Sequence, residues 1–249
     1  MSIDQKLIVL LGPTASGKTA LAVELACALD GEIISADSRQ IYRRLDIGTG
    51  KDLKEYGFIP YHLIDSHDIG EAFSVAHFQK AAFDAINDVF ARGKQPILCG
   101  GTGLYIESLL ANYQFSHVPH FLTEPLDIQF KYTVFGLNPS TANRRDKISA
   151  RFQARLKEGM LEEVQQLLYE GVNPEELRWM GLEYKWIVNY IEGVIKKEEF
   201  EKGLETAIHQ FAKRQMTYFR KMERAGIAIN WIPDALDFQA KRDFVLNFS

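Results

Sequence analysis

The segment Gly12-Pro13-Thr14-Ala15-Ser16-Gly17-Lys18-Thr19 decides the fold of this chain. It matches the pattern G-x-x-x-x-G-K-[ST], follows an all-apolar run over 7–11 and precedes a helical pattern over 19–29. A strand, a glycine-rich turn and a helix in this order place a cradle of backbone N–H groups at a helix N-terminus, where the helix dipole favours anions. The sequence therefore predicts a polyphosphate or pyrophosphate site.

The residue types in this loop suit phosphate binding. The glycines let the backbone fold tightly around the anion, Lys18 can reach the outer phosphates, and the Thr19 hydroxyl can ligate Mg²⁺. Kinases, GTPases and nucleotide-dependent motors all share such a loop, so it does not name the reaction. The candidate diphosphate-binding residues of the loop are Gly12, Thr14, Ala15, Ser16, Gly17, Lys18 and Thr19.

Strands and helices alternate along the rest of the chain. In the first half, the patterns predict strands over 32–36, 61–64 and 96–99 and a helix over 73–92. In the second half they predict a strand over 130–137, helices over 141–224 with breaks near Gly159, Asn173-Pro174 and Gly193, a strand over 227–232 and a short C-terminal helix. This order predicts an α/β fold, a P-loop NTPase-like parallel sheet with helices on both faces and a helical C-terminal part.

We expect one P-loop α/β domain over 1–249. Residues 1–112 would carry the phosphate- and base-binding part, 113–129 a loop, and 130–249 the mostly helical part. With 249 residues, 46% hydrophobic and 25% charged, the composition is that of an ordinary globular protein. The sequence lacks a signal-peptide pattern and a run of about 20 apolar residues, which favours a cytoplasmic protein without membrane contact. Cys27 and Cys99 lie in apolar runs and are expected to be buried, reduced thiols.

Polar residues follow two of the predicted strands where these end. Asp37-Ser38-Arg39-Gln40 follows the second strand, and Gly100-Gly101-Thr102 follows a later one. The carboxyl ends of parallel strands meet at one sheet edge, where ligands of open α/β sheets bind. Asp37 could act as a general base, help to hold Mg²⁺, or only form an Asx turn that ends the strand. Ser38 and Gln40 are neutral groups suited to a base edge.

The net charge of −4 conceals an uneven distribution. Residues 1–129 contain 10 Lys and Arg against 16 Asp and Glu, whereas residues 130–249 contain 19 against 17. Two segments, 142–157 and 209–224, are strongly basic, and the second interleaves its charges with Phe211, Tyr218 and Phe219. Basic helices with aromatic neighbours can bind single-stranded RNA, although solvated helix faces over core aromatics remain the alternative. Trp179, Trp186 and Trp231 lie in apolar surroundings and are expected in the core.

Several segments together resemble the isopentenyl-tRNA transferase family, the tRNA dimethylallyltransferases. The resemblance is continuous over about residues 5–113 and looser over 130–232. The D-S-x-Q and G-G-T-x-L-Y patterns, in register with the P-loop, are far more specific than the loop itself. The matching segments are GPTASGKT (12–19), ISADSRQIYRRLDIGTGK (34–51), HLID (62–65), FSVAHFQ (73–79), GGTGLY (100–105) and AKRQMTYFRK (212–221).

The resemblance implies prenyl transfer. The P-loop would hold the pyrophosphate of dimethylallyl diphosphate with Arg151 and Mg²⁺, and the N6 of an adenine would attack the allylic carbon. The residue that matches Asp37 accepts the N6 proton in that family, and the one that matches Thr102 contacts the bridging side of the diphosphate; Lys18 would assist the departure of the pyrophosphate. Ser38, Arg39 and Gln40 join Asp37 as candidate acceptor-binding residues. A monomer is favoured over an oligomer.

The sequence also departs from this family. The helical insertion that grips the anticodon stem is missing, because only 111–129 fills its place. The common G-Y-[KR]-[EQ] motif appears as Gly181-Leu182-Glu183-Tyr184, and His209 replaces an arginine. We expect an adenosine of the tRNA anticodon loop as the acceptor. The alternatives are a free adenine nucleotide as the acceptor, a small-molecule P-loop kinase, and a nucleotide-binding module without activity.

Overall fold

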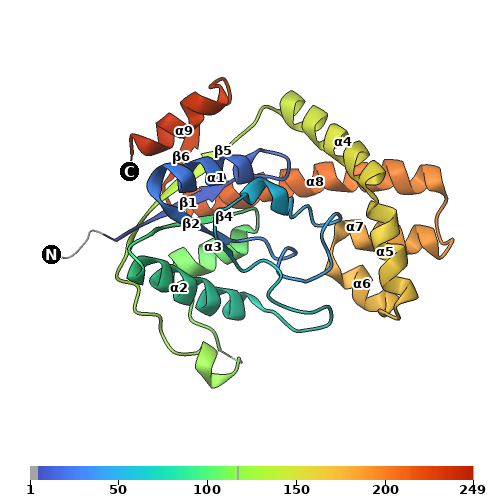
Figure 1. Cartoon of the computed structure of the whole chain (residues 1–249), viewed down its shortest axis with the longest axis horizontal. Helices are drawn as coiled ribbons and strands as arrows, with labels where there is room; N and C mark the ends of the chain where they lie inside the picture. Colours follow the sequence, from blue (N-terminus) through green and yellow to red (C-terminus); the bar gives the residue numbers. More distant parts are fainter. Residues whose placement is uncertain (1–4, 117, 249) are drawn as a thin grey trace.

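Six parallel strands form one sheet at the centre of the molecule (Figure 1). The computed structural model describes residues 5–116 and 118–248. The strands lie in the order β3-β2-β4-β1-β5-β6, so the strand that leads into the P-loop is flanked by β4 and β5. The strands are β1 (Lys6–Leu11), β2 (Gly31–Ser35), β3 (Tyr61–His62), β4 (Gln95–Gly100), β5 (Lys131–Leu137) and β6 (Ile229–Ile232).

Helices cover both faces of this sheet and extend beyond it as a helical lobe. The helices of the first half are α1 (Lys18–Leu29), α2 (Val75–Ala91) and α3 (Gly103–Leu110), with short 3-10 turns η1 (Leu53–Tyr56) and η2 (His120–Leu122). Those of the second half are α4 (Thr141–Glu158), α5 (Met160–Tyr169), α6 (Pro174–Met180), α7 (Leu182–Ile191), α8 (Lys197–Arg224) and α9 (Phe238–Leu246).

Strand β1 is apolar throughout because both of its faces are buried. Leu7, Val9 and Leu11 pack against α2, α3 and the C-terminal part of α8. Ile8 and Leu10 face the opposite way and pack against α1 and α9. The alternation of side chains along the strand thus divides one short run between two layers of the core.

A third cluster of buried residues forms the core of the helical lobe. It joins side chains of α4 to α8 with the segment 41–45 that follows β2. Helix α8 takes part in two cores, because Phe200 and Leu204 pack in the lobe while Met216 and Phe219 pack on the sheet. Figure 1 shows α8 running from the lobe to behind the sheet.

The structure confirms the predicted α/β fold with a parallel sheet and helices on both faces, and it moves several boundaries. The helical region has a further break at Gly181, between α6 and α7. Both thiols are free and Cys99 is buried, but the expectation was wrong for Cys27, which is exposed on the solvent side of α1. Among the described residues, no helix is long and apolar enough to cross a membrane.

Candidate diphosphate and acceptor site

The P-loop connects β1 to α1 with the backbone bent into a cradle. Ala15 and Gly17 adopt the left-handed conformation, with φ of 59° and 82°. A Cβ atom on Gly12 would lie 2.8 Å from Ser16 Oγ, so the loop closes tightly only with glycine there. Ser16 Oγ is buried and has no hydrogen-bond partner among the described residues. An unpartnered hydroxyl inside an N–H-rich loop is suited to a phosphate oxygen.

Lys18 begins α1 and lines the cleft beside the loop. Burial lowers the pKa of its ammonium group. The neighbouring Cys99 and Asp37 raise this pKa, whereas the positive charges of Arg151 and Arg155 lower it further. Lys18 and the two arginines are therefore close enough to repel one another, which is expected of a site that a polyanion neutralises.

The ends of β2 and β4 meet as predicted. The Ser38 backbone N–H donates to Thr102 Oγ1 at 3.1 Å, which ties the two strand ends together. A Cβ on Gly100 would lie 2.2 Å from the carbonyl oxygen of Ala36, so this glycine permits the close approach of the strands. Asp37, Ser38 and Thr102 all line the cleft that contains Lys18. The sheet edge thus presents a carboxylate and two hydroxyls to the phosphate cradle.

The remaining acceptor-side candidates are held by the protein itself. Asp37 Oδ1 accepts the Arg39 backbone N–H at 3.0 Å, so the Asx turn forms while the side chain still lines the cleft. Gln40 Nε2 donates to the Gly50 carbonyl at 3.1 Å, and its Oε1 accepts the Ser35 hydroxyl at 3.2 Å. Arg39 Nη1 donates to the Trp179 carbonyl at 2.9 Å. These bonds fix the orientation of both side chains at the cleft.

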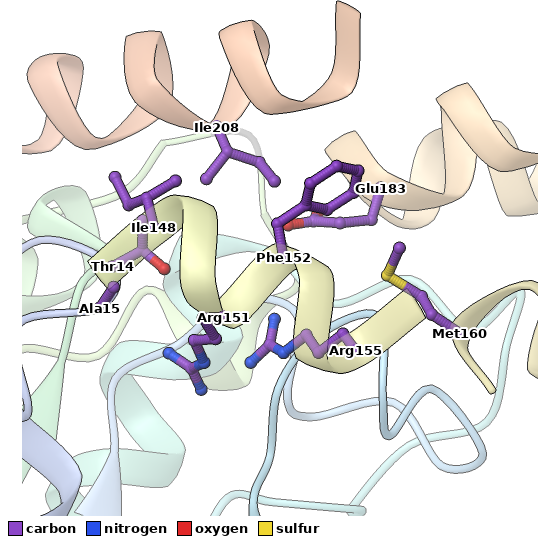
Figure 2. A pocket seen from close by; sticks show the side chains of 9 residues that line it. All are labelled: Thr14, Ala15, Ile148, Arg151, Phe152, Arg155, Met160, Glu183 and Ile208. Atoms are coloured by element: carbon purple, nitrogen blue, oxygen red, sulfur yellow. The ribbon is translucent and has the colours of Figure 1, made fainter. Parts of the chain in front are cut away.

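Two arginines extend from α4 toward the P-loop. Figure 2 shows Arg151 and Arg155 one helical turn apart, with their guanidinium groups below the helix. Arg151 donates to the Asp52 carboxylate and to the Gly50 carbonyl, at 3.3 Å in the second case. Both arginines line the cleft with Lys18. The structure therefore brings the predicted Arg151 to the phosphate cradle, together with a second arginine that the sequence analysis did not single out.

Gln215 is a second residue that the sequence analysis missed. It is buried on α8, accepts the Thr14 backbone N–H at 2.8 Å and donates to the Gly101 carbonyl at 2.9 Å. These two bonds hold the P-loop and the loop after β4 against α8. The AKRQ match contains this glutamine, and an amide at a buried position of an amphipathic helix was the available signal.

The cleft has a volume of about 570 Å³ and lies between the sheet edge and the helical lobe. Trp179 and Phe211 line it and are 78% and 39% exposed. The expectation of a core position was therefore wrong for Trp179, because it lies at the end of α6, where the chain leaves the lobe core. Trp186 and Trp231 do pack against the cores. A cleft of this size accommodates a diphosphate and a base together.

The two basic segments divide between the cleft and the surface. On α4, Arg145 and Lys147 are exposed, whereas Arg151 and Arg155 turn inward. On α8, Phe219 lies in the core and Phe211 faces the cleft. The aromatic side chains of this segment are thus shared between packing and the site.

Mg²⁺ binding would depend on few protein atoms. Thr19 lines the cleft beside Lys18, and within 5–116 and 118–248 no group of three or more His, Cys, Asp or Glu could hold a metal ion. Mg²⁺ keeps several waters and takes its remaining ligands from one or two protein groups and from phosphates. One hydroxyl beside an anion cradle fits that preference.

A phosphate cradle that faces a carboxylate and two hydroxyls across one cleft defines a P-loop protein whose cleft has room for two substrates. A family model described as IPP transferase matches residues 40–129 and 118–222, and one described as isopentenyl transferase matches residues 5–57. The chain belongs to the IPP transferase family.

Named relatives extend this match over nearly the whole chain. The chain is 40% identical to tRNA dimethylallyltransferase 2 of Bacteroides fragilis, over 97% of each, and 42% identical to tRNA dimethylallyltransferase 1 of Parabacteroides distasonis, over 95% of each. A crystal structure of a tRNA isopentenylpyrophosphate transferase from Bacillus halodurans has a TM-score of 0.87 and 28% identity, covering 98% of this chain and 95% of that one.

The comparisons also locate the missing insertion. The alignment with the B. fragilis relative spans 297 positions, whereas this chain has 249 residues, so at least 48 positions have no counterpart here. The family model matches in two pieces that meet at 118–129. This overlap of the two matched pieces lies within 111–129, the interval that the sequence analysis identified as shortened, and η2 lies in it as well.

Proposed function

We propose that this chain transfers the dimethylallyl group from dimethylallyl diphosphate to N6 of an adenosine in the anticodon loop of tRNA. The observation that carries the proposal is the single cleft that joins the P-loop to Asp37 and Thr102. Relatives at about 40% identity carry the name tRNA dimethylallyltransferase. The likeness includes both sides of the cleft, because the matched ranges contain the P-loop and the strand edge alike.

In this reaction a bond forms between N6 and the allylic carbon while the bond from that carbon to the diphosphate oxygen breaks. Lys18 and Arg151 bind the departing pyrophosphate and stabilise its growing charge. The Asp37 carboxylate accepts the proton that leaves N6, and the Asx turn to Arg39 holds that carboxylate in place. Thr102, whose hydroxyl accepts the Ser38 backbone N–H, would contact the bridging side of the diphosphate.

The remaining candidates bind and orient the substrates. The N–H groups of the loop from Gly12 to Thr19 enclose the diphosphate, and the Thr19 hydroxyl would hold Mg²⁺ against it. When bound, the metal neutralises charge on the leaving pyrophosphate. Ser38, Arg39 and Gln40 form the wall on which the adenine edge rests.

The test is an assay with labelled dimethylallyl diphosphate and three acceptors: tRNA, its anticodon stem-loop, and AMP. The proposal expects label in the two RNAs and none in AMP. Label in AMP alone would assign the chain to nucleotide prenylation instead. No label in any acceptor, with pyrophosphate still bound by the protein, would reject both reactions.

A further inference from the structure

Arg155 carries a buried charge that the fold does not neutralise well. Its side chain is 11% exposed, and its Nη2 atom has no hydrogen-bond partner among the described residues. The nearest carboxylate is that of Asp52, at 3.8 Å, which is also bonded by Arg151. Burial lowers the pKa of the Arg155 guanidinium, and Arg151 lowers it further. A buried donor of a charged group without a hydrogen bond is costly, so the Nη2 atom of Arg155 is suited to an acceptor on a ligand.

The surroundings of Arg155 identify the kind of partner. A small cavity of about 20 Å³ extends from Arg155 past Arg151 to Thr14 and Ala15 of the P-loop, and its size suits about one water (Figure 2). Arg155 also lines the large cleft with Lys18. Arg155 therefore shares both the small cavity and the cleft with the P-loop, which holds the anion in the proposed reaction. Because Arg155 is almost wholly enclosed, a phosphate of the RNA backbone on the surface could not reach it.

Two neighbours lie beside Arg155. Gly50 lies directly against the guanidinium, since a Cβ there would come within 1.4 Å of Nη2. Glu183 faces the same small cavity from the start of α7. Glu183 occupies the position at which the G-Y-[KR]-[EQ] motif carries a basic residue. In this chain that position is acidic, and Arg155 of α4 is a basic residue that lines the small cavity with Glu183.

We infer that Arg155 is a second diphosphate-binding arginine, which donates to a phosphate oxygen of the bound diphosphate beside Arg151. The inference rests on the proposed function, because it takes the anion in the P-loop to be the diphosphate of the prenyl donor. Asp52 already accepts a hydrogen bond from Arg151, whereas Nη2 of Arg155 has no hydrogen-bond partner among the described residues. The planar guanidinium suits two oxygens of one phosphate.

The test compares Arg155→Met with the wild-type chain and with Arg145→Met, a matched control on the exposed face of α4. Inorganic pyrophosphate is the probe, and its Kd is measured by calorimetry. We expect Arg155→Met to raise the Kd about tenfold or more, the usual effect of losing a hydrogen bond to a charged group. Arg145→Met should leave it within about twofold. The Tm without ligand is measured beside the Kd, because a purely structural role of Arg155 would lower the Tm and leave the Kd unchanged.

The outcomes distinguish a failure of the proposed function from a failure of the role assigned to Arg155. If the wild-type chain does not bind pyrophosphate, the proposed function fails. If it binds and Arg155→Met binds equally well, only the role of Arg155 is rejected. A lower Tm with unchanged pyrophosphate affinity would make Arg155 a structural residue. If Arg155→Met does not fold, Arg155→Lys carries the test: its ammonium lacks the planar fork, so the Kd should rise several-fold, and an unchanged Kd would contradict the inference.

Discussion

The Oε1 atom of Gln215 accepts the backbone N–H of Thr14 at 2.8 Å and so fastens the phosphate loop to α8, 201 residues further along the chain. The other end of the same amide donates to Gly101, in the loop after β4. One buried side chain therefore sets the distance between two loops that must bind one substrate. Its position makes the shape of the cradle depend on the packing of α8 against the sheet.

Gln215→Leu should weaken both the fold and the cradle. It leaves the Thr14 N–H and the Gly101 carbonyl without their partners, so we expect the free energy of unfolding to fall by about 1–3 kcal/mol. Pyrophosphate affinity should fall as well, because the loop is no longer held. Denaturant titration with and without pyrophosphate measures both. Gln210→Leu, at an exposed position of the same helix, is the control and should change neither.

Asp37→Asn should separate proton transfer from binding. The amide keeps an oxygen that can accept the Arg39 N–H, so the turn after β2 is retained, but it cannot take the N6 proton. Turnover should fall by about 10²-fold or more while the Kd for pyrophosphate stays unchanged. Single-turnover kinetics with labelled donor measures the chemical step. Unchanged turnover would remove Asp37 from the role of base.

Trp179→Ala should affect the RNA and not the diphosphate. Trp179 is 78% exposed at the mouth of the cleft, where its ring can stack on a base. Stacking contributes about 1–3 kcal/mol per base, so we expect KM for tRNA to rise roughly 5- to 150-fold with little change in Tm. Tyr169→Ala is the control, because Tyr169 is 88% exposed at the end of α5 and does not line the cleft. Equal effects of the two substitutions would count against a stacking site.

Glu183→Gln should stabilise the protein at neutral pH and not in acid. Burial raises the pKa of Glu183, and Arg155 offsets this only in part. The folded state thus binds this proton more tightly than the unfolded state, so ionisation costs stability as the pH rises from about 4.5 through the folded pKa. Above that range the substitution removes the whole cost, whereas below about pH 4 the wild-type chain and the variant should be equally stable. Urea unfolding at neutral pH and in acid checks the difference; a stabilisation that persists in acid would contradict it.

The sequence predicted those parts of the site whose position follows from the order of neighbouring strands, loops and helices along the chain. The P-loop follows from the succession of an apolar strand, two glycines and a helix, and the meeting of Asp37 with Thr102 follows from the parallel order of the strands. In each case a residue's place in the sheet follows from its distance to a strand end.

The parts that the sequence did not predict depend on how helices far along the chain pack. Periodicity indicated that 141–224 is helical, but it did not show that one turn of α4 would bring Arg155 under the P-loop. Trp179 was misplaced for a related reason: apolar neighbours indicate a helix near a core, whereas its exposure depends on the break at Gly181 that turns the chain out of the lobe. The bonds of Gln215 to two separate loops depend on how α8 packs against them, which helical periodicity does not determine.

Helix α8 joins the core of the helical lobe to the core on the sheet. Its 28 residues span about 42 Å, and no interruption occurs between the end that packs in the lobe and the end that packs on the sheet. The lobe and the sheet are therefore joined by one continuous helix, which also carries Phe211 and Gln215 at the cleft. A substitution that shifts α8 in the lobe core is thus expected to move these two cleft residues as well, so the packing of the lobe and the geometry of the site depend on each other.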